Sequence, residues 1–125
     1  MGIQVVWDDE AKSILRWDFE TDWGWDDFRR AFEKSVDMGG NVGYRVDVIP
    51  YAGAIQQLPM GALREFQRIE RSLPDNTGLI VITGGNTFTN AIINVFAKVN
   101  RINTWMTAKT LEDARAIIAR DREKP

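Results

Sequence analysis

The sequence predicts a small α/β domain with a mixed, mostly parallel five-stranded sheet and about four helices. Short β-rich runs alternate with helical patterns in the order β-β-α-β-α-β-α-β-α. Such alternation implies right-handed crossovers and parallel strands. A short polar loop joins the first two β-rich runs, which indicates one antiparallel hairpin. The length of 125 residues and a hydrophobic content of 44% fit one core and a single domain over residues 1–125.

The hairpin is predicted over residues 3–8 and 14–20. In the second run, Leu15, Trp17 and Phe19 alternate with polar residues, which is typical of a strand with one wet face. We expect Trp7 and Trp17 to pair across this hairpin, because cross-strand aromatic pairs stabilise antiparallel strands.

The first helix is predicted over residues 25–38, and "GGNVG" ends it. Its apolar residues recur at helical spacing and are Trp25, Phe28, Phe32 and Val36. A strand follows over 44–51 and ends at or near Pro50, since proline cannot donate a ladder hydrogen bond.

The second helix is predicted to start with Pro59 at its first position and to run to about Leu73. One face of it carries Ala62, Phe66, Ile69 and Leu73. The apolar run at 79–83 is typical of a strand covered on both faces. A helix over about 87–100 follows, and its expected core stripe is Phe88, Ala91, Ile92, Val95, Phe96 and Val99.

The last strand is predicted over 102–108. Thr110 and Asp113 then form a box-like start of the final helix, whose apolar residues are Leu111, Ala114, Ile117 and Ile118.

Composition excludes several kinds of chemistry. The chain has no cysteine and no histidine, so disulfides, thiolate nucleophiles and Ser-His-Asp sites cannot form within it. The net charge of −2 gives no case for a nucleic-acid partner, which would need clustered Lys and Arg. No stretch reaches the length of a membrane span. We therefore expect a cytoplasmic protein without a cofactor or a metal.

Three segments resemble the STAS/SpoIIAA-like family. "DWGWDDF" (22–28) is similar to the tryptophan-rich opening of the first helix in uncharacterised SpoIIAA-like bacterial proteins. "TLEDARAII" (110–118) resembles the capped final helix of the family, and the strand at 79–83 resembles its central strand. The resemblance implies a SpoIIAA-like fold used for protein or small-ligand binding.

STAS regulators carry a phosphorylated Ser or Thr at the start of the second helix. The matching stretch here, residues 50–63, contains neither residue type. The phospho-switch of the family therefore does not transfer to this chain.

A glycine turn follows the apolar strand. Thr83 is followed by Gly84, Gly85, Asn86 and Thr87. The helix-start amides could face an anion, but neither a Walker pattern nor a dinucleotide pattern is present. A tight turn with Asn86 or Thr87 as the N-cap is the simpler interpretation.

The five tryptophans are a second candidate feature. Trp25 is expected in the core, and Trp23 is expected to act as a hydrophobic staple at the helix start. Alternatively, exposed tryptophans could line a pocket or a protein-binding patch, and we expect Trp23 and Trp105 to be the most exposed.

Acidic residues cluster at two places. Asp8, Asp9 and Glu10 lie in the hairpin turn, and Asp22, Asp26 and Asp27 lie at a helix start. Turns and first helical turns are ordinary places for carboxylates, and the spacing matches no calcium loop.

The loop at 51–60 is unusually apolar, and its large residues are Tyr51, Ile55, Leu58 and Met60. It could line a pocket for a nonpolar ligand or cover a partner surface, or it could pack back on the second helix.

These features support three hypotheses. The favoured one is a non-enzymatic binding module for a protein or a small nonpolar ligand, acting at the loops after Pro50 and Thr83. The second is an enzyme or anion site at Gly84, Gly85 and Thr87, with Asp47 as a possible carboxylate. The third is a homodimer built through exposed tryptophans and an edge strand.

Overall fold

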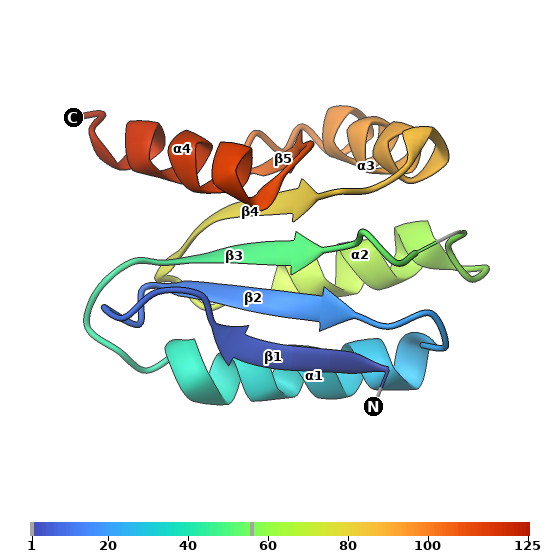
Figure 1. The fold of residues 1–125 in the computed structure, drawn as a ribbon, viewed down its shortest axis with the longest axis horizontal. Helices are drawn as coiled ribbons and strands as arrows, with labels where there is room; N and C mark the ends of the chain where they lie inside the picture. Colours follow the sequence, from blue (N-terminus) through green and yellow to red (C-terminus); the bar gives the residue numbers. More distant parts are fainter. Residues whose placement is uncertain (1, 56) are drawn as a thin grey trace.

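The elements of the chain form one twisted sheet with helices on both faces (Figure 1). This arrangement is seen in a computed structural model that describes residues 2–55 and 57–125. The elements, in chain order, are β1 (Ile3–Trp7), β2 (Ile14–Phe19), α1 (Trp25–Gly39), β3 (Val46–Tyr51), α2 (Ala62–Ser72), β4 (Thr77–Thr83), α3 (Thr87–Val99), β5 (Trp105–Ala108) and α4 (Leu111–Arg122).

The strand order in the sheet is the same as the order in the chain, β1-β2-β3-β4-β5. β1 and β2 are antiparallel, and all other neighbouring pairs are parallel. The α/β fold class, the mixed sheet and the predicted element order are therefore confirmed.

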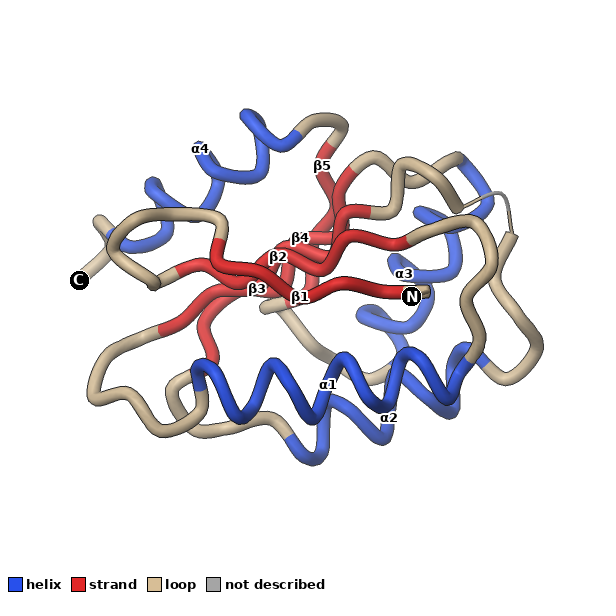
Figure 2. The backbone as a smooth tube through the Cα atoms, turned by 60° about the horizontal axis from the view of Figure 1, so that its bottom comes forward, coloured by secondary structure: helices blue, strands red, loops and turns tan. Residues whose placement is uncertain are grey.

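Two apolar cores lie on the two faces of the sheet. The larger core includes Phe28 of α1, Phe66 of α2 and Phe96 of α3. The smaller core joins Ile118 of α4 to Val81 of β4 and their neighbours. Figure 2 shows the same division, with α1 and α2 on one side of the sheet and α4 on the other.

The hairpin register differs from the predicted tryptophan pair. Trp17 lies opposite Val5, and Trp7 lies opposite Leu15. The prediction that Trp7 and Trp17 pair directly is therefore wrong. The register is set by the loop between the strands, where Asp9 accepts hydrogen bonds from the amides of Ser13 and Ile14.

The start of α1 agrees with the prediction from the sequence. Trp23 precedes the N-cap Gly24, and its ring lies 6.1 Å from that of Phe28, so the hydrophobic staple is confirmed. The carboxylate of Asp27 accepts from the Gly24 amide at 2.9 Å. At the other end of the chain, Thr110 caps α4 by accepting from the Asp113 amide at 3.0 Å.

The start of α2 differs from the prediction. The helix begins at Ala62 rather than at Pro59, and its N-cap Gly61 has a φ of 91°. This left-handed conformation favours glycine. The Trp25 indole donates to the Met60 carbonyl at 2.6 Å, so the preceding turn is tied to α1 before the chain becomes helical.

The buried face of α3 was predicted only in part, since Phe96 of the expected stripe is buried. Thr89, Ile93 and Phe96 face the core, whereas Phe88, Val95 and Val99 of the expected stripe are 57%, 52% and 72% exposed. The expected Ala91 is exposed, and Ile92 is half-buried. Because α3 is apolar on more than one side, spacing alone does not identify the face that packs.

β3 and β5 begin later than predicted, at Val46 and Trp105. The Tyr44 hydroxyl instead donates to the Lys12 carbonyl at 3.0 Å. The amide of Ile102 donates to the Ala97 carbonyl at 2.8 Å, so this residue completes the end of α3.

Ion pairs attach α4 to the sheet at both ends. Near its start, Arg115 contacts Asp8 of the hairpin at 2.8 Å. Near its end, Arg122 contacts Asp47, which is fully buried and also binds Arg45. Arg45 in turn reaches Asp121 at 2.8 Å.

Candidate functional site

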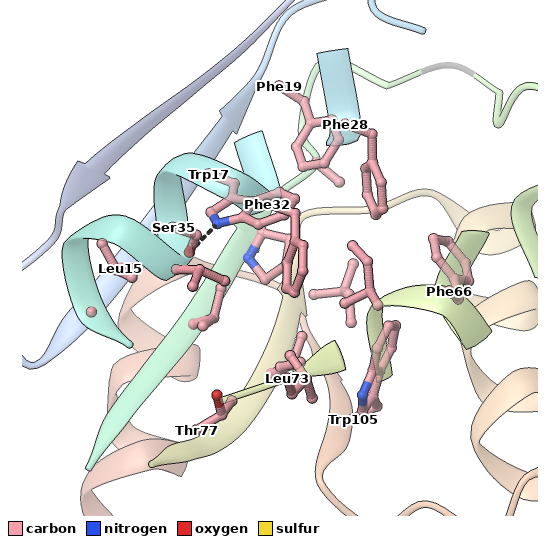
Figure 3. A pocket seen from close by; sticks show the side chains of 18 of the residues that line it. Leu15, Trp17, Phe19, Phe28, Phe32, Ser35, Phe66, Leu73, Thr77 and Trp105 are labelled. Carbon is pink, nitrogen blue, oxygen red and sulfur yellow. Dashed lines mark hydrogen bonds between the residues drawn. The ribbon is translucent and has the colours of Figure 1, made fainter. Parts of the chain in front are cut away.

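An apolar cavity of about 80 Å³ lies between the sheet and helices α1 and α2. Figure 3 shows its walls, with Trp17, Phe28 and Phe66 among the side chains that surround it. Its lining includes residues from both ends of α1, with Trp23 just before the helix and Gly39 as its last residue.

Each neighbouring element contributes residues to the walls. The sheet contributes Leu15, Trp17, Phe19, Val46, Val48, Pro50, Ile80, Ile82 and Trp105. α1 contributes Phe28, Phe32, Ser35, Val36 and Gly39, and α2 contributes Phe66 and Ile69. These are core positions of their elements, so the cavity is a space within the larger core.

Aromatic rings in edge-on or tilted contact form much of the frame. The ring centroids of Trp17 and Phe28 are 5.4 Å apart with planes at 72°. Those of Phe66 and Trp105 are 5.6 Å apart. Such pairs are favourable, but the rigid rings have few conformations with which to fill a remaining space.

Most polar groups in the walls are hydrogen-bonded within the protein. The Trp17 indole donates to Ser35 Oγ at 3.1 Å, and the Trp105 indole donates to Glu70 at 2.6 Å. Asn76 donates to the Gly39 carbonyl at 2.8 Å. A ligand in the cavity would therefore meet mainly carbon, as nonpolar ligands require.

Thr89 differs from these groups. It also lines the cavity and is 2% exposed. Its hydroxyl has no hydrogen-bond partner among residues 2–55 and 57–125.

Four of the predicted site residues line the cavity, namely Trp23, Ile55, Leu58 and Trp105. Trp105 is only 6% exposed, so the prediction that it is an exposed tryptophan is wrong. It is buried because Phe96 and Phe66 pack on its ring.

The predicted apolar loop is divided between the interior and the surface. Ile55 is buried against the core, whereas Tyr51 and Met60 are 38% and 95% exposed and lie outside the cavity lining. Tyr51 is the last residue of β3 rather than part of the loop. Gln56 lies outside the described residues.

The glycine turn is closely packed. Gly84 has a φ of 76°, and a Cβ there would come within 3.3 Å of the Tyr51 ring. The Gly84 amide donates to the Ala108 carbonyl at 3.0 Å, so it is not available to an anion. Thr83 is fully buried, and its carbonyl accepts from the Ala52 amide at 2.7 Å.

The start of α3 has an internal cap. Asn86 is the N-cap and accepts from the Thr89 amide at 2.8 Å, and Thr87 is the first residue of the helix. Gly85 lies beside Asn90 and Thr89. This agrees with the interpretation of the segment as a tight turn with Asn86 as the N-cap.

Asp47 lies far from this turn. It is the second residue of β3, whereas Gly84 follows the last residue of the parallel neighbour β4. Its carboxylate accepts from the Leu79 amide at 2.6 Å and pairs with Arg45 and Arg122. The carboxylate therefore contributes to holding α4 and does not meet Gly84 or Thr87.

Most acidic residues of the two predicted clusters, namely Asp8, Asp9, Asp26 and Asp27, have structural partners. Asp8 pairs with Arg115 and Arg16. The hydrogen bond from Arg115 is the largest influence on the pKa of Asp8 and, with Arg16, lowers it despite burial. Hydrogen bonding from the Gly24 amide likewise lowers the pKa of Asp27. The described part of the chain contains no cluster of three residues suited to hold a metal ion.

The sequence did not identify the helical walls of the cavity as a site. The spacing predicts only that Phe28, Phe32 and Phe66 are core residues. Their aromatic side chains are the one feature of the sequence that could have indicated the cavity wall. Whether rings from distant segments leave a space between them depends on tertiary packing.

Comparisons with known proteins do not identify a relative. No family model matches the chain, and the searches of curated proteins and of solved structures gave no significant match. Within the described residues, every helix is too short or too polar to cross a membrane.

Proposed function

We propose that the protein is a non-enzymatic binding module of the SpoIIAA-like type that takes a small nonpolar ligand between the sheet and helices α1 and α2. The observation that carries the proposal is the apolar cavity. The element order supports the SpoIIAA-like assignment.

The size and lining of the cavity favour a narrow ligand. Its volume of about 80 Å³ is smaller than the ~150 Å³ of an engineered cavity that binds benzene. Because the volume is small and the lining is almost entirely apolar, a short alkyl chain fits this space better than a fused ring system.

A series of straight-chain alkanols, from ethanol to octanol, tests the proposal. Three tryptophans line the cavity, namely Trp17, Trp23 and Trp105. Binding should therefore change their fluorescence and raise the melting temperature. Affinity should increase with chain length, because each buried CH₂ contributes about 0.8 kcal/mol, until the cavity is filled.

A matched pair of substitutions locates the binding. Val48→Phe places a ring in the cavity, since Val48 lines it, and should abolish the alkanol response. Val95→Phe makes the same change on the exposed side of α3 and should leave the response intact. An equal response in both variants would mean that alkanols bind elsewhere, and no response in the unmodified protein would overturn the proposal.

Contact with another protein through α3 is a second candidate. Phe88, Val95 and Val99 are more than half exposed, and exposed apolar residues gathered on one helix are typical of interaction sites. Light scattering over a range of concentrations tests whether the partner is a second copy. A constant monomer mass would exclude self-association and leave only a different partner.

A further inference from the structure

The outward side of α2 carries a row of arginines, which we call the α2 arginine row: Arg64, Arg68 and Arg71. The opposite side of the helix, with Phe66 and Ile69, is buried. Intervals of four and three residues place the three arginines on one exposed face. None of the three forms an ion pair or hydrogen bond with another of the described residues.

The carboxylates of α2 have hydrogen-bond partners outside this row, although the charges of Arg68 and Arg64 still contribute to lowering the pKa of Glu65. Glu65 is 5% exposed and binds Arg29 of α1 at 2.8 Å. Glu70 accepts the indole proton of Trp105 at 2.6 Å. The neighbouring α3 contains one charged residue, Lys98, while the exposed side of α1 carries both signs. The row is therefore a local positive surface on a protein whose net charge is −2.

Two exposed apolar side chains lie at the start of the row. Met60 is 95% exposed and Leu63 is 46% exposed. The hydrogen bond from the Trp25 indole to the Met60 carbonyl holds the backbone here. In a helix that lies at a membrane interface, the apolar face enters the lipid beside the cationic residues. The apolar face of α2 is buried in the core instead, so only Met60 and Leu63 are left to reach the lipid.

We propose that this face docks on an anionic phospholipid surface, with the α2 arginine row against the headgroups and Met60 and Leu63 in contact with the acyl boundary. α2 occupies the helical layer between α1 and α3 (Figure 1), so its outward side can approach a flat surface. The positive row complements anionic lipid, to which each nearby Lys or Arg adds attraction.

The choice of a membrane over an acidic protein segment has a second support. Phe66 and Ile69, on the inner side of the same helix, line the apolar cavity. Ligands that fit such a cavity concentrate in membranes. This second support rests on the proposed function, whereas the charge and the exposed apolar residues do not.

Sedimentation with vesicles tests the docking. The unmodified protein should sediment with phosphatidylcholine vesicles that contain phosphatidylglycerol, and much less with pure phosphatidylcholine. Replacing each arginine of the row by glutamine should weaken binding about fivefold, since each nearby cation contributes about 1 kcal/mol. Met60→Ser should also weaken binding, because it removes the side chain that enters the acyl boundary.

A control with the same charge change separates the row from net charge. Lys12, Lys109 and Arg120 are exposed, lie outside α2 and can be replaced together by glutamine. This variant should retain most of the binding. The proposal is overturned if this control loses as much vesicle binding as the variant in which all three arginines of the row are replaced by glutamine. It is also overturned if the unmodified protein does not sediment with the vesicles.

Two further measurements complete the test. The first measures binding to soluble polyglutamate. If the protein binds polyglutamate as tightly as it binds vesicles, and Met60→Ser has no effect, the partner is an acidic protein segment and membrane docking is overturned. The second measures alkanol binding in solution, which requires no vesicle and should persist in the triple variant. Vesicle binding therefore tests the docking proposal and alkanol binding tests the cavity proposal, so either can fail without the other.

Discussion

Ser35 has a defined role in the wall of the cavity, because it accepts the indole proton of the buried Trp17 at 3.1 Å. Ser35→Ala should leave that N–H unpaired among apolar groups and cost about 1–3 kcal/mol of unfolding free energy. Denaturant unfolding measures the change. Ser72→Ala, at the exposed end of α2, is the control, and an equally small effect of both would contradict this role.

Thr89 and Thr83 are two buried threonines with different hydroxyl environments. Thr83 Oγ1 donates to the Val81 carbonyl at 2.9 Å, whereas Thr89 Oγ1 has no partner in the described chain. Thr83→Val should therefore destabilise by about 1 kcal/mol, and Thr89→Val should be neutral or stabilising. Thermal unfolding of the pair tests this, and a larger loss at Thr89 would show that its hydroxyl is hydrogen-bonded.

The residues of the site were only partly predictable. The staple between Trp23 and Phe28 depends on neighbours in the sequence, so the local pattern predicted it correctly. The burial of Trp105 depends on Phe66 and Phe96. Those contacts come from other elements, and no local spacing identifies them.

Among the elements, α4 has the clearest dependence on charged groups. Arg122 binds the fully buried Asp47, whereas Arg115 binds Asp8 from a more exposed position. Arg122→Ala should cost about 1–3 kcal/mol, because it leaves part of a buried charge unpaired, with Arg45 still in place. Arg115→Ala should cost a similar amount, because the Asp8 side chain is only 1% exposed and would keep Arg16 alone as its partner.

Hydrogen exchange distinguishes local from general destabilisation. Arg122→Ala should increase exchange in α4 more than in α1, which packs on the other face of the sheet. Uniform change in both helices would contradict a local attachment of α4.

The order and type of the elements followed from the sequence because strands, turns and caps are encoded locally. The cap of α4 by Thr110 is one example. The start of α2 was not predictable, because the Met60 carbonyl is held by Trp25 from another helix. The cavity was not predictable either, since it arises where side chains of several elements fail to fill one space.

For the whole molecule, paired carboxylates determine the response to acid. The hydrogen bond from Arg29 lowers the pKa of Glu65, and that from Arg45 lowers the pKa of Asp121. Asp8 is shifted in the same direction. As the pH falls, these carboxylates take up protons at a higher pH in the unfolded chain than in the folded chain. They therefore stabilise the fold at pH values above their ordinary pKa values.

Stability should accordingly be nearly constant around neutral pH and fall as the pH drops below the ordinary values of 4.5 for Glu and 3.8 for Asp. Melting temperatures across this range measure the effect. Glu65→Gln should lower stability at neutral pH and reduce the fall in acid, because one of the responsible groups is absent. An unchanged acid profile in this variant would contradict the role of Glu65.

The agreement between strand order and chain order has a consequence for synthesis. Each new strand pairs with the strand made just before it, so the sheet can grow by addition while the chain leaves the ribosome. α4 follows all five strands, yet it covers Ile49, Leu79 and Val81. That face of the nascent sheet stays uncovered until α4 emerges, and apolar surface exposed in this way makes a folding intermediate prone to aggregate.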